Sequence, residues 1–274
     1  MKIAQYYEGS RIRLGQIDNG NLYPTDFDGD MIDFLNGKRD YNTSGISVPI
    51  ENVEFAAPVS RPTKIMAIGL NYKDHIKESK GEMPDVPLVF AKFPNSLTGH
   101  NKSIIWDPSL VKKVDFEAEL AVIIGKTIHN CTDKEAMTAV FGYTCGNDVS
   151  ARDLQFGDGQ WVRGKSLDTF CPLGPWIVSA DEIDDPNSLD IRCLLNGETM
   201  QKSNTGMMIF RLPQLISFLS RYFTLNPGDI IMTGTPHGVG AFREPSVYMK
   251  DNDEVIVEIE GIGRLRNICR QVLL

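Results

Sequence analysis

Two glutamates, Glu117 and Glu119, stand two positions apart in the stretch FEAELAVIIGK. If this stretch is a strand, both side chains project from the same face, about 6.6 Å apart along the backbone. Apolar residues occupy both faces of the stretch: Ala118, Leu120, Val122 and Ile124 on one, Ala121 and Ile123 on the other. An exposed pair would be an ordinary solvated feature, but this pattern is typical of a strand buried on both sides. With no basic residue nearby, a divalent cation would offset the cost of burying the two charges.

A third acid, Asp148, follows the turn-prone Gly146 and Asn147 and is expected at a strand end that faces the glutamates. Ligation by carboxylates alone favours Mg²⁺ or Mn²⁺ and leaves positions for water or substrate. The four histidines and five cysteines show no spacing typical of zinc ligands. The residues therefore predict a magnesium or manganese site made of Glu117, Glu119 and Asp148.

His75 and Glu78 stand three positions apart in GLNYKDHIKES, on an expected short helix. There the carboxylate can orient the imidazole as a general base. A histidine beside a glutamate is common on helix surfaces and by itself means little. Here, however, the helix follows an apolar strand and leads into a loop, residues 79–87, that contains one glycine and two prolines. Such a loop is typical of an active-site lid.

Residues 159–166, GQWVRGKS, satisfy the G-x-x-x-x-G-K-S pattern of a phosphate-binding P-loop. A P-loop requires an apolar strand before it and a helix after it. Here ARDLQFGD precedes the pattern, and LDTFCPLGP follows it with prolines and a glycine that break a helix. Nucleotide binding is therefore a remote alternative. Lys165 is interpreted as a single cation in an ordered loop, with an ordinary surface lysine as the other interpretation.

The rest of the chain consists mostly of short strand patterns. The expected strands are 3–7, 12–17, 22–23, 65–70, 88–91, 116–124, 176–178, 191–195, 229–233 and 255–259. Asn-Gly pairs at 19–20 and 196–197 predict hairpin turns, because both central residues of a type I′ turn need positive φ. Pro58 and Pro62 favour a boundary, so we expect a small β-rich N-terminal domain over 1–60 and a catalytic domain over 61–274.

Helices are few and short in this pattern. Thr132 and Glu135 form a capping box before an expected helix at 136–141. A second helix, with Pro213 near its start, has one apolar face. The residues of this face are Leu212, Leu215, Ile216, Leu219 and Phe223. Because the strands do not alternate regularly with helices, we expect a β-rich α+β fold and not a Rossmann or barrel plan.

The 274 residues carry a formal net charge of -8, which argues against a nucleic-acid or anionic-membrane surface. No apolar run approaches the roughly 20 residues of a membrane span. The N-terminus lacks the apolar stretch of a signal peptide, and the five cysteines are odd in number without C-x-x-C spacing. We therefore expect a cytoplasmic protein that binds a small molecule and has no nucleic-acid or membrane partner.

Six blocks, in this order, carry a resemblance to a known family: GLNYKDH, DFEAELAVIIGK, GYTCGNDVSARDLQ, RGKSLDTFCPLGPW, LNGETMQ and NPGDIIMTGTPHGVG. They resemble the fumarylacetoacetate hydrolase family over residues 64–268. The first 60 or so residues are similar to the small β domain that many bacterial members carry. The resemblance implies layered mixed sheets in a roll with few short helices, a homodimer, and a Mg²⁺ or Mn²⁺ site.

The resemblance also implies roles for single residues. It matches Glu117, Glu119 and Asp148 to the metal ligands, and His75 with Glu78 to a lid dyad that activates water. The remaining matches are Arg152 and Gln155 near the substrate, Lys165 as an active-site lysine and Thr235 at the substrate carboxylate. The loop at 79–87 and the segment at 242–246 differ among members.

The implied chemistry is that of an enolate. A 2-oxo or diketo acid chelates the metal, which stabilises the enolate, while His75 moves the proton. We expect hydrolysis of a carbon-carbon bond in an acylpyruvate or fumarylpyruvate type of β-diketo acid, because His75 and Glu78 supply a base that activates water. The resemblance places such a reaction in the catabolism of aromatic compounds. Oxaloacetate-type decarboxylation and isomerisation of 2-hydroxyhepta-2,4-diene-1,7-dioate remain alternatives on the same site.

Overall fold

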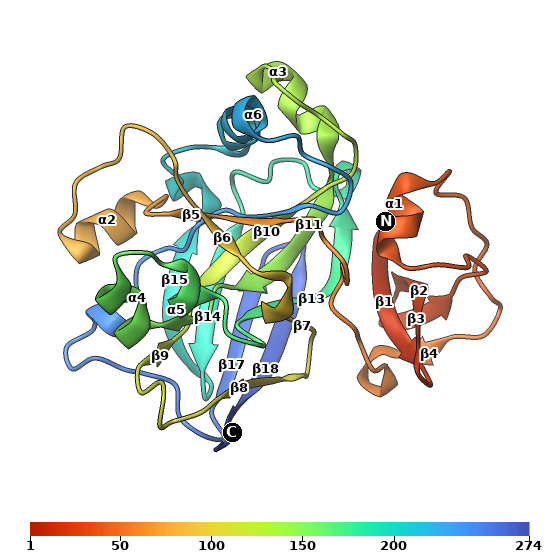
Figure 1. Cartoon of the computed structure of the whole chain (residues 1–274). Helices are drawn as coiled ribbons and strands as arrows, with labels where there is room; N and C mark the ends of the chain where they lie inside the picture. The colour runs from red at the N-terminus through yellow and green to blue at the C-terminus, as the bar shows by residue number, and fades with distance from the viewer. Residues whose placement is uncertain (274) are drawn as a thin grey trace.

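The computed structural model describes residues 1–273, and its regular structure is mainly β-sheet (Figure 1). The strands are β1 (Lys2–Glu8), β2 (Arg11–Asp18), β3 (Asn21–Pro24), β4 (Val48–Pro49), β5 (Ile65–Gly69), β6 (Leu88–Lys92), β7 (Leu97–Thr98), β8 (Ser103–Trp106), β9 (Val114–Asp115), β10 (Ala118–Ile124), β11 (Val140–Asn147), β12 (Ser150–Ala151), β13 (Cys171–Ser179), β14 (Asp190–Leu195), β15 (Glu198–Asn204), β16 (Ile230–Met232), β17 (Glu254–Ile259) and β18 (Gly263–Gln271).

Helices are short and lie around the sheets. The α-helices are α1 (Met31–Asn36), α2 (Lys73–Ser79), α3 (Asp133–Ala136), α4 (Arg152–Asp158), α5 (Val162–Lys165) and α6 (Leu212–Tyr222). The 3-10 helices are η1 (Ile50–Asn52), η2 (Pro94–Ser96), η3 (Met137–Ala139), η4 (Ala180–Glu182), η5 (Thr205–Met207) and η6 (Gly240–Phe242). Helices α3 and α6 contact each other above one edge of the sheets, while α2 projects on the side opposite the N-terminal unit (Figure 1). The expected β-rich α+β fold is confirmed.

Two layered sheets hold most of the strands. The larger has eleven strands in the order β4-β3-β2-β1-β13-β11-β10-β16-β5-β6, with β7 added beside β13. The second has five strands in the order β15-β14-β17-β18-β8, and β9 pairs separately with β12. Most neighbours are antiparallel, but β5 and β16, β7 and β13, and β8 and β18 are parallel. The sheets are therefore mixed.

Strand β10 lies inside the larger sheet and is buried along its whole length. The side chains of one face, Leu120, Val122 and Ile124, belong to the core that also contains residues of β14 and β17. Those of the other face, Ala121 and Ile123, belong to a second core on the opposite side of the sheet. The expectation of a strand buried on both faces is confirmed, and the start of β10 is the point at which the site forms.

The helix expected at 136–141 is wrong in its extent. The capping box is present, since the backbone N–H of Thr132 donates to Glu135 Oε2 at 2.9 Å. The α-helix ends at Ala136, however, and after one 3-10 turn the chain enters β11 at Val140. Residues 140–147 pair with both β10 and β13, and this pairing outweighs the local helical pattern. Phe223, expected on the face of the second helix, lies just past the end of α6 and is half-exposed.

The first strands form a compact unit that continues the larger sheet at β13 (Figure 1). The turn between β2 and β3 has Asn19 at φ 44° and Gly20 at φ 75°, as the hairpin prediction requires. Only Lys2 and Ile3 of β1 pair with β13. The domain boundary near residue 60 stays a prediction.

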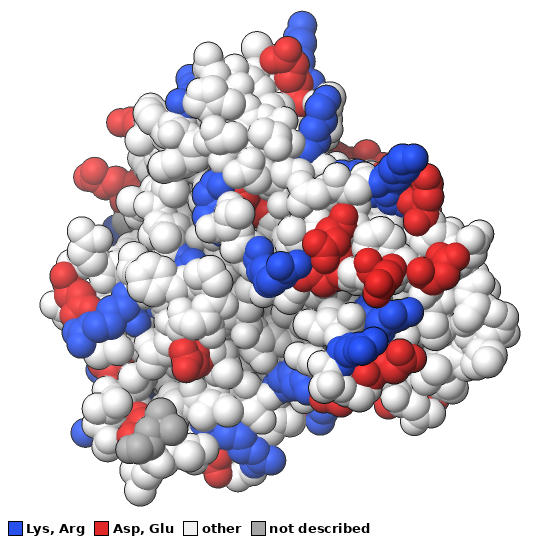
Figure 2. All heavy atoms as spheres, turned by 45° about the vertical axis from the view of Figure 1, so that its right-hand side comes forward, with Lys and Arg blue, Asp and Glu red and all other residues white. Residues whose placement is uncertain are grey.

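Charges of both signs are mixed on the surface. Figure 2 shows basic side chains lying next to acidic ones on one face of the molecule. Within residues 1–273, no helix is long and apolar enough to cross a membrane. All five cysteines are buried and unpaired.

Candidate metal centre and active site

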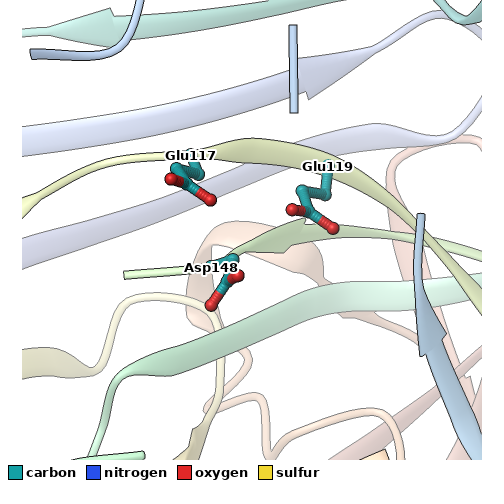
Figure 3. A group of neighbouring side chains, drawn as sticks. All are labelled: Glu117, Glu119 and Asp148. Carbon is teal, nitrogen blue, oxygen red and sulfur yellow. The ribbon is translucent and has the colours of Figure 1, made fainter. Parts of the chain in front are cut away.

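Three carboxylates meet where β10 begins and β11 ends (Figure 3). Glu117 precedes β10, Glu119 is its second residue, and Asp148 follows the last residue of β11. One oxygen from each lies within 4.8 Å of the others, and all three side chains are buried. Because β10 and β11 are antiparallel neighbours, the start of one strand meets the end of the other. The structure therefore brings the three predicted ligands together.

Basic side chains are buried against these carboxylates. The Lys165 ammonium donates to Glu117 Oε2 at 2.7 Å and to Asp148 Oδ2 at 2.8 Å. The guanidinium of Arg152 lies 2.7 Å from Glu117 Oε1, and Lys92 donates to Asp148 Oδ1 at 2.6 Å. The sequence argument that the glutamates have no basic neighbour is therefore wrong. The cations come from distant segments that only the fold brings together.

Glu117 and Glu119 have opposite electrostatic surroundings. Burial would raise the pKa of Glu117, but the charges of Lys165 and Arg152 lower it to about 2. Burial raises the pKa of Glu119 well above its ordinary value, and the charges of Asp148 and Glu117 raise it further. Among the salt bridges of residues 1–273, none involves Glu119. Glu119 is therefore the carboxylate whose charge a bound cation would stabilise most.

The donor set fits a hard divalent cation. Every candidate ligand atom is a carboxylate oxygen, the type that Mg²⁺ and Mn²⁺ prefer. Four buried carboxylates, with Asp115 as the fourth, face the three buried cations of Lys92, Arg152 and Lys165. With all four carboxylates ionised, one negative charge remains unbalanced in the protein itself, and a divalent cation held by the triad would leave one positive charge for an anionic substrate. The role of the three residues as metal ligands stays a prediction.

Lys165 is the last residue of α5, which packs closely on α4. A Cβ on Gly164 would lie 2.7 Å from the backbone nitrogen of Gln155, so only glycine allows this approach. The Lys165 side chain is 2% exposed, and the surface interpretation is therefore wrong. Strand β13 follows the G-x-x-x-x-G-K-S pattern where a P-loop would have its helix. The rejection of a P-loop agrees with this arrangement.

His75 lies on α2 and faces the same cavity as the triad. Its Nδ1 atom is 3.3 Å from Glu78 Oε2, one turn further along the helix, as the spacing predicts. The other carboxylate oxygen of Glu78 accepts the backbone N–H of Gly238 at 2.9 Å. The ring of Phe242 lies 5.7 Å from the imidazole, measured between centroids. His75 is thus buried and held from two sides.

Thr235 and Gln155 line the cavity with polar atoms. The hydroxyl oxygen of Thr235 accepts Gln201 Nε2 at 2.8 Å. Gln155 Oε1 accepts a hydrogen bond from Arg152 Nη1 at 2.8 Å. Arg152 is in turn held by Asp115, whose Oδ2 atom accepts its Nε at 2.8 Å. Arg152 therefore acts mainly on protein carboxylates in this structure, although it also borders the cavity.

The cavity above the triad has a volume of about 80 Å³. Its polar lining is formed by His75, Glu117, Glu119, Asp148, Arg152, Gln155, Lys165 and Thr235. Its apolar lining is formed by Ile68, Leu70, Phe90, Phe156, Trp161 and Phe242. Of the predicted site residues, only Glu78 does not line it, and Glu78 acts on it through His75. A larger hollow of about 850 Å³ near Trp106 contains none of the predicted residues, so size alone does not identify the site.

Three residues of the site were missed in the sequence. Lys92, Asp115 and Gln201 are each buried to 1% exposure or less. The available signals were weak: Lys92 ends an apolar strand pattern, Asp115 precedes the FEAEL stretch, and Gln201 ends the LNGETMQ block. Each acts through partners far away in the chain, which local spacing does not reveal.

In this β-rich fold, buried carboxylates, a lysine and a histidine share one cavity. Such a cavity is typical of an enzyme active site and not of a nucleotide-binding loop. The chain belongs to the fumarylacetoacetate hydrolase family, because the family model described as "Fumarylacetoacetate (FAA) hydrolase C-terminal" matches residues 64–270. The resemblance noted in the six sequence blocks is confirmed, and the chain is an enzyme of this family.

Relatives of this chain carry out different reactions. It is 48% identical over 221 residues to the mitochondrial oxaloacetate tautomerase Fahd2a of Rattus norvegicus, covering 80% of this chain and 70% of the relative. The solved structure of a fumarylacetoacetate hydrolase from Exiguobacterium antarcticum superposes with a TM-score of 0.90 at 36% identity, covering 99% and 100% of the two chains. For the 2-hydroxyhepta-2,4-diene-1,7-dioate isomerase of Mycobacterium marinum the TM-score is 0.83 at 33% identity, covering 99% and 98%. Membership alone therefore leaves the reaction open.

Proposed function

We propose that this enzyme interconverts the keto and enol forms of a small 2-oxo acid, with oxaloacetate as the first substrate to test. The observation that carries the proposal is the shared cavity of about 80 Å³, which His75, Lys165 and the carboxylate triad all line. The carboxylates suit a metal that a 2-oxo acid chelates, and the imidazole suits the transfer of a proton from C3 of that acid. The similarity to an oxaloacetate tautomerase supports the same choice.

Glu117, Glu119 and Asp148 would hold a Mg²⁺ or Mn²⁺ ion. When bound there, such an ion supplies Lewis-acid polarisation of a 2-oxo carboxylate. The triad is buried whereas Phe242, on the same cavity, is 39% exposed, so the acid group of the substrate would lie at the triad. The remainder of the substrate would then lie towards His75 and Phe242.

Three polar groups of the chain remain available to a substrate. Lys165 directs two of its three N–H donors at Glu117 and Asp148, which leaves the third for a substrate oxygen. The Thr235 oxygen accepts a hydrogen bond from Gln201, so its own O–H can donate to the substrate carboxylate. The amide nitrogen of Gln155 is a further donor at the cavity wall.

His75 moves the proton in this proposal. Because Glu78 lies next to Nδ1, the proton of the neutral ring is assigned to Nδ1, and Nε2 is the base. Nε2 accepts a proton from C3 of the keto acid, the C–H electrons form the C2–C3 double bond, and the protonated ring then gives its Nε2 proton to the oxygen on C2. The base is thereby regenerated, and no other reactant is consumed.

The test follows the decay of enolic oxaloacetate by its ultraviolet absorbance. We expect the enzyme with Mn²⁺ or Mg²⁺ to accelerate the decay, and chelator-treated enzyme or the Glu119→Ala variant to leave the buffer rate unchanged. Product analysis for pyruvate separates tautomerisation from decarboxylation. Unaltered enol decay in the presence of the metal-loaded wild type would reject the proposal.

Hydrolysis of an acylpyruvate or fumarylpyruvate type of diketo acid is the second candidate. It is favoured by the two hydrogen-bonding contacts of Glu78, which fix the imidazole in one orientation suited to activating water. A panel of acylpyruvates, fumarylpyruvate and 2-hydroxyhepta-2,4-diene-1,7-dioate, assayed with Mn²⁺, compares the candidates directly. Release of pyruvate from an acylpyruvate at a higher kcat/KM than tautomerisation would place hydrolysis first.

A further inference from the structure

Helix α2 carries His75 but has few apolar contacts of its own. Only His75 and Ile76 are buried among its seven residues, and its N-terminus has no side-chain cap. The loop that follows, residues 79–87, is largely exposed. A helix this short is marginal by itself, so its position must come from contacts with the rest of the protein. The contacts of α2 are therefore expected to determine where His75 lies.

Two carboxylates four positions apart, Asp74 and Glu78, attach α2 to one short segment. Residues with this spacing lie on the same side of a helix. Oδ2 of Asp74 lies 3.0 Å from Nδ1 of His237, and Oε1 of Glu78 accepts the backbone N–H of Gly238 at 2.9 Å. Oδ2 of Asp74 also accepts the hydroxyl of Ser203. The first and last turns of α2 are thus held by adjacent residues of one loop.

That loop is itself attached to the metal-binding strand. Gln201, which is fully buried, donates through Nε2 to Thr235 Oγ1 and to the carbonyl of Pro236, both at 2.8 Å. Its Oε1 accepts the backbone N–H of Ala118, between the two glutamates, at 2.9 Å. Gln201 and Ser203 are two positions apart on β15. A continuous set of hydrogen bonds therefore connects β10 with α2.

We propose that Asp74 is a positioning residue which, through His237 and Ser203, holds His75 at a set place relative to Glu117 and Glu119. The base lies on a weakly packed helix, the triad lies at the buried start of β10 and the end of β11, and these hydrogen bonds join α2 to β10. Asp74 does not line the cavity and acts only through α2. The catalytic part of this inference rests on the proposed function, since it assigns the proton transfer to His75.

The test compares Asp74→Asn with wild type in the Mn²⁺-loaded enzyme. Removing the charge weakens both contacts of Oδ2 while retaining the size of the side chain. We expect kcat for oxaloacetate tautomerisation to fall about tenfold or more, because small displacements of a catalytic group are costly. KM and the affinity for Mn²⁺ should change by no more than about twofold, because the triad is untouched. Hydrogen exchange of the α2 amides should become about tenfold faster.

Lys77→Gln is the matched control, because Lys77 lies on the exposed side of the same helix. It should leave kcat and α2 exchange at their wild-type values. His237→Gln should reduce kcat less than Asp74→Asn, since Ser203 still donates to Asp74. The factor by which kcat falls in the double variant should be smaller than the product of the two single factors, because both residues belong to one contact.

Three outcomes would overturn the inference. They are an unchanged kcat in Asp74→Asn, an unchanged exchange rate of α2, or a parallel loss of Mn²⁺ affinity, which would indicate general misfolding. If the wild type turned over no 2-oxo acid, the proposed function would fail, yet the exchange comparison would still decide whether Asp74 holds α2.

Discussion

Nζ of Lys165 lies 2.7 Å from Oε2 of Glu117, although the two residues are 48 positions apart. The pair is buried, and the same ammonium also donates to Asp148. The site is therefore partly neutralised by the protein itself. A metal ion would share these carboxylates with Lys165 and would not be their sole counter-charge.

Metal binding should stabilise the fold. Mn²⁺ or Mg²⁺ added to chelator-treated protein is expected to raise Tm, because a ligand that binds only the folded state stabilises it by about 2.7 kcal/mol at a hundred times Kd. Glu117→Ala, Glu119→Ala and Asp148→Ala should each abolish the increase, measured by scanning calorimetry. Glu198→Ala, at an exposed position of β15, is the control and should retain it. Tightly bound zinc in elemental analysis would contradict the carboxylate site.

Removing Lys165 should expose the charge imbalance of the site. Lys165→Met leaves Glu117 and Asp148 buried with only Arg152 and Lys92, and we expect a loss of about 3 kcal/mol in the free energy of unfolding without metal. Urea titrations with and without Mn²⁺ measure this loss, which should be smaller with the ion. Lys202→Met, at an exposed position, should change stability little. Equal losses with and without Mn²⁺ would show that Lys165 and the ion do not share the carboxylates.

His75 should be needed for turnover and not for metal binding. His75→Ala is expected to lower kcat by about 10² to 10⁴, the usual contribution of a general base, with Mn²⁺ affinity nearly unchanged. Glu78→Gln should cause a smaller decrease, because the amide can still contact the ring. His129→Ala alters an exposed histidine and serves as the control. Joint loss of metal and activity in His75→Ala would identify His75 as a ligand or a structural residue.

His100 should make stability depend on pH. Burial, together with the charges of Arg266 and Arg264, lowers the pKa of His100 from 6.5 to about 4. Between these two values the unfolded chain binds one more proton at His100 than the folded chain does. The free energy of unfolding is therefore highest above pH 6.5, and the part that depends on His100 is lost as pH falls from 6.5 towards 4. The loss between pH 7 and 5 should be at most about 2 kcal/mol in urea titrations.

The variant His100→Gln should flatten this dependence, while His129→Gln should leave it as in the wild type. The ring nitrogen of His100 accepts a hydrogen bond from the backbone N–H of Arg266, and the variant loses this bond. The free energy of unfolding of the variant is therefore first compared with that of the wild type at pH 7. A pH dependence that is identical in both variants would assign the effect to other groups.

The homodimer that the family resemblance implies can be tested by light scattering. A mass twice the 30.6 kDa of one chain is expected at micromolar concentration. A single-chain mass across the accessible concentration range would contradict it.

Local spacing was sufficient for the parts of the site that lie close together in the chain. Glu117 and Glu119 converge because alternate residues of any strand face the same way, and His75 meets Glu78 because residues three apart adjoin on a helix. The double burial of β10 followed from apolar residues on both of its faces. These properties depend on backbone geometry over a few residues, which the sequence determines directly.

The tertiary structure decided everything that depends on strand order and packing. It ended the expected helix at 136–141 early and placed Val140 and Phe141 in a strand, because β10 and β13 offered backbone partners on both sides. It also placed Lys92, Arg152 and Lys165 against the triad and joined α2 to β10 through Gln201. Such contacts join segments tens of residues apart, and their energies depend on which surfaces meet. No local pattern contains that information, so the charge balance of the site became visible only in the folded chain.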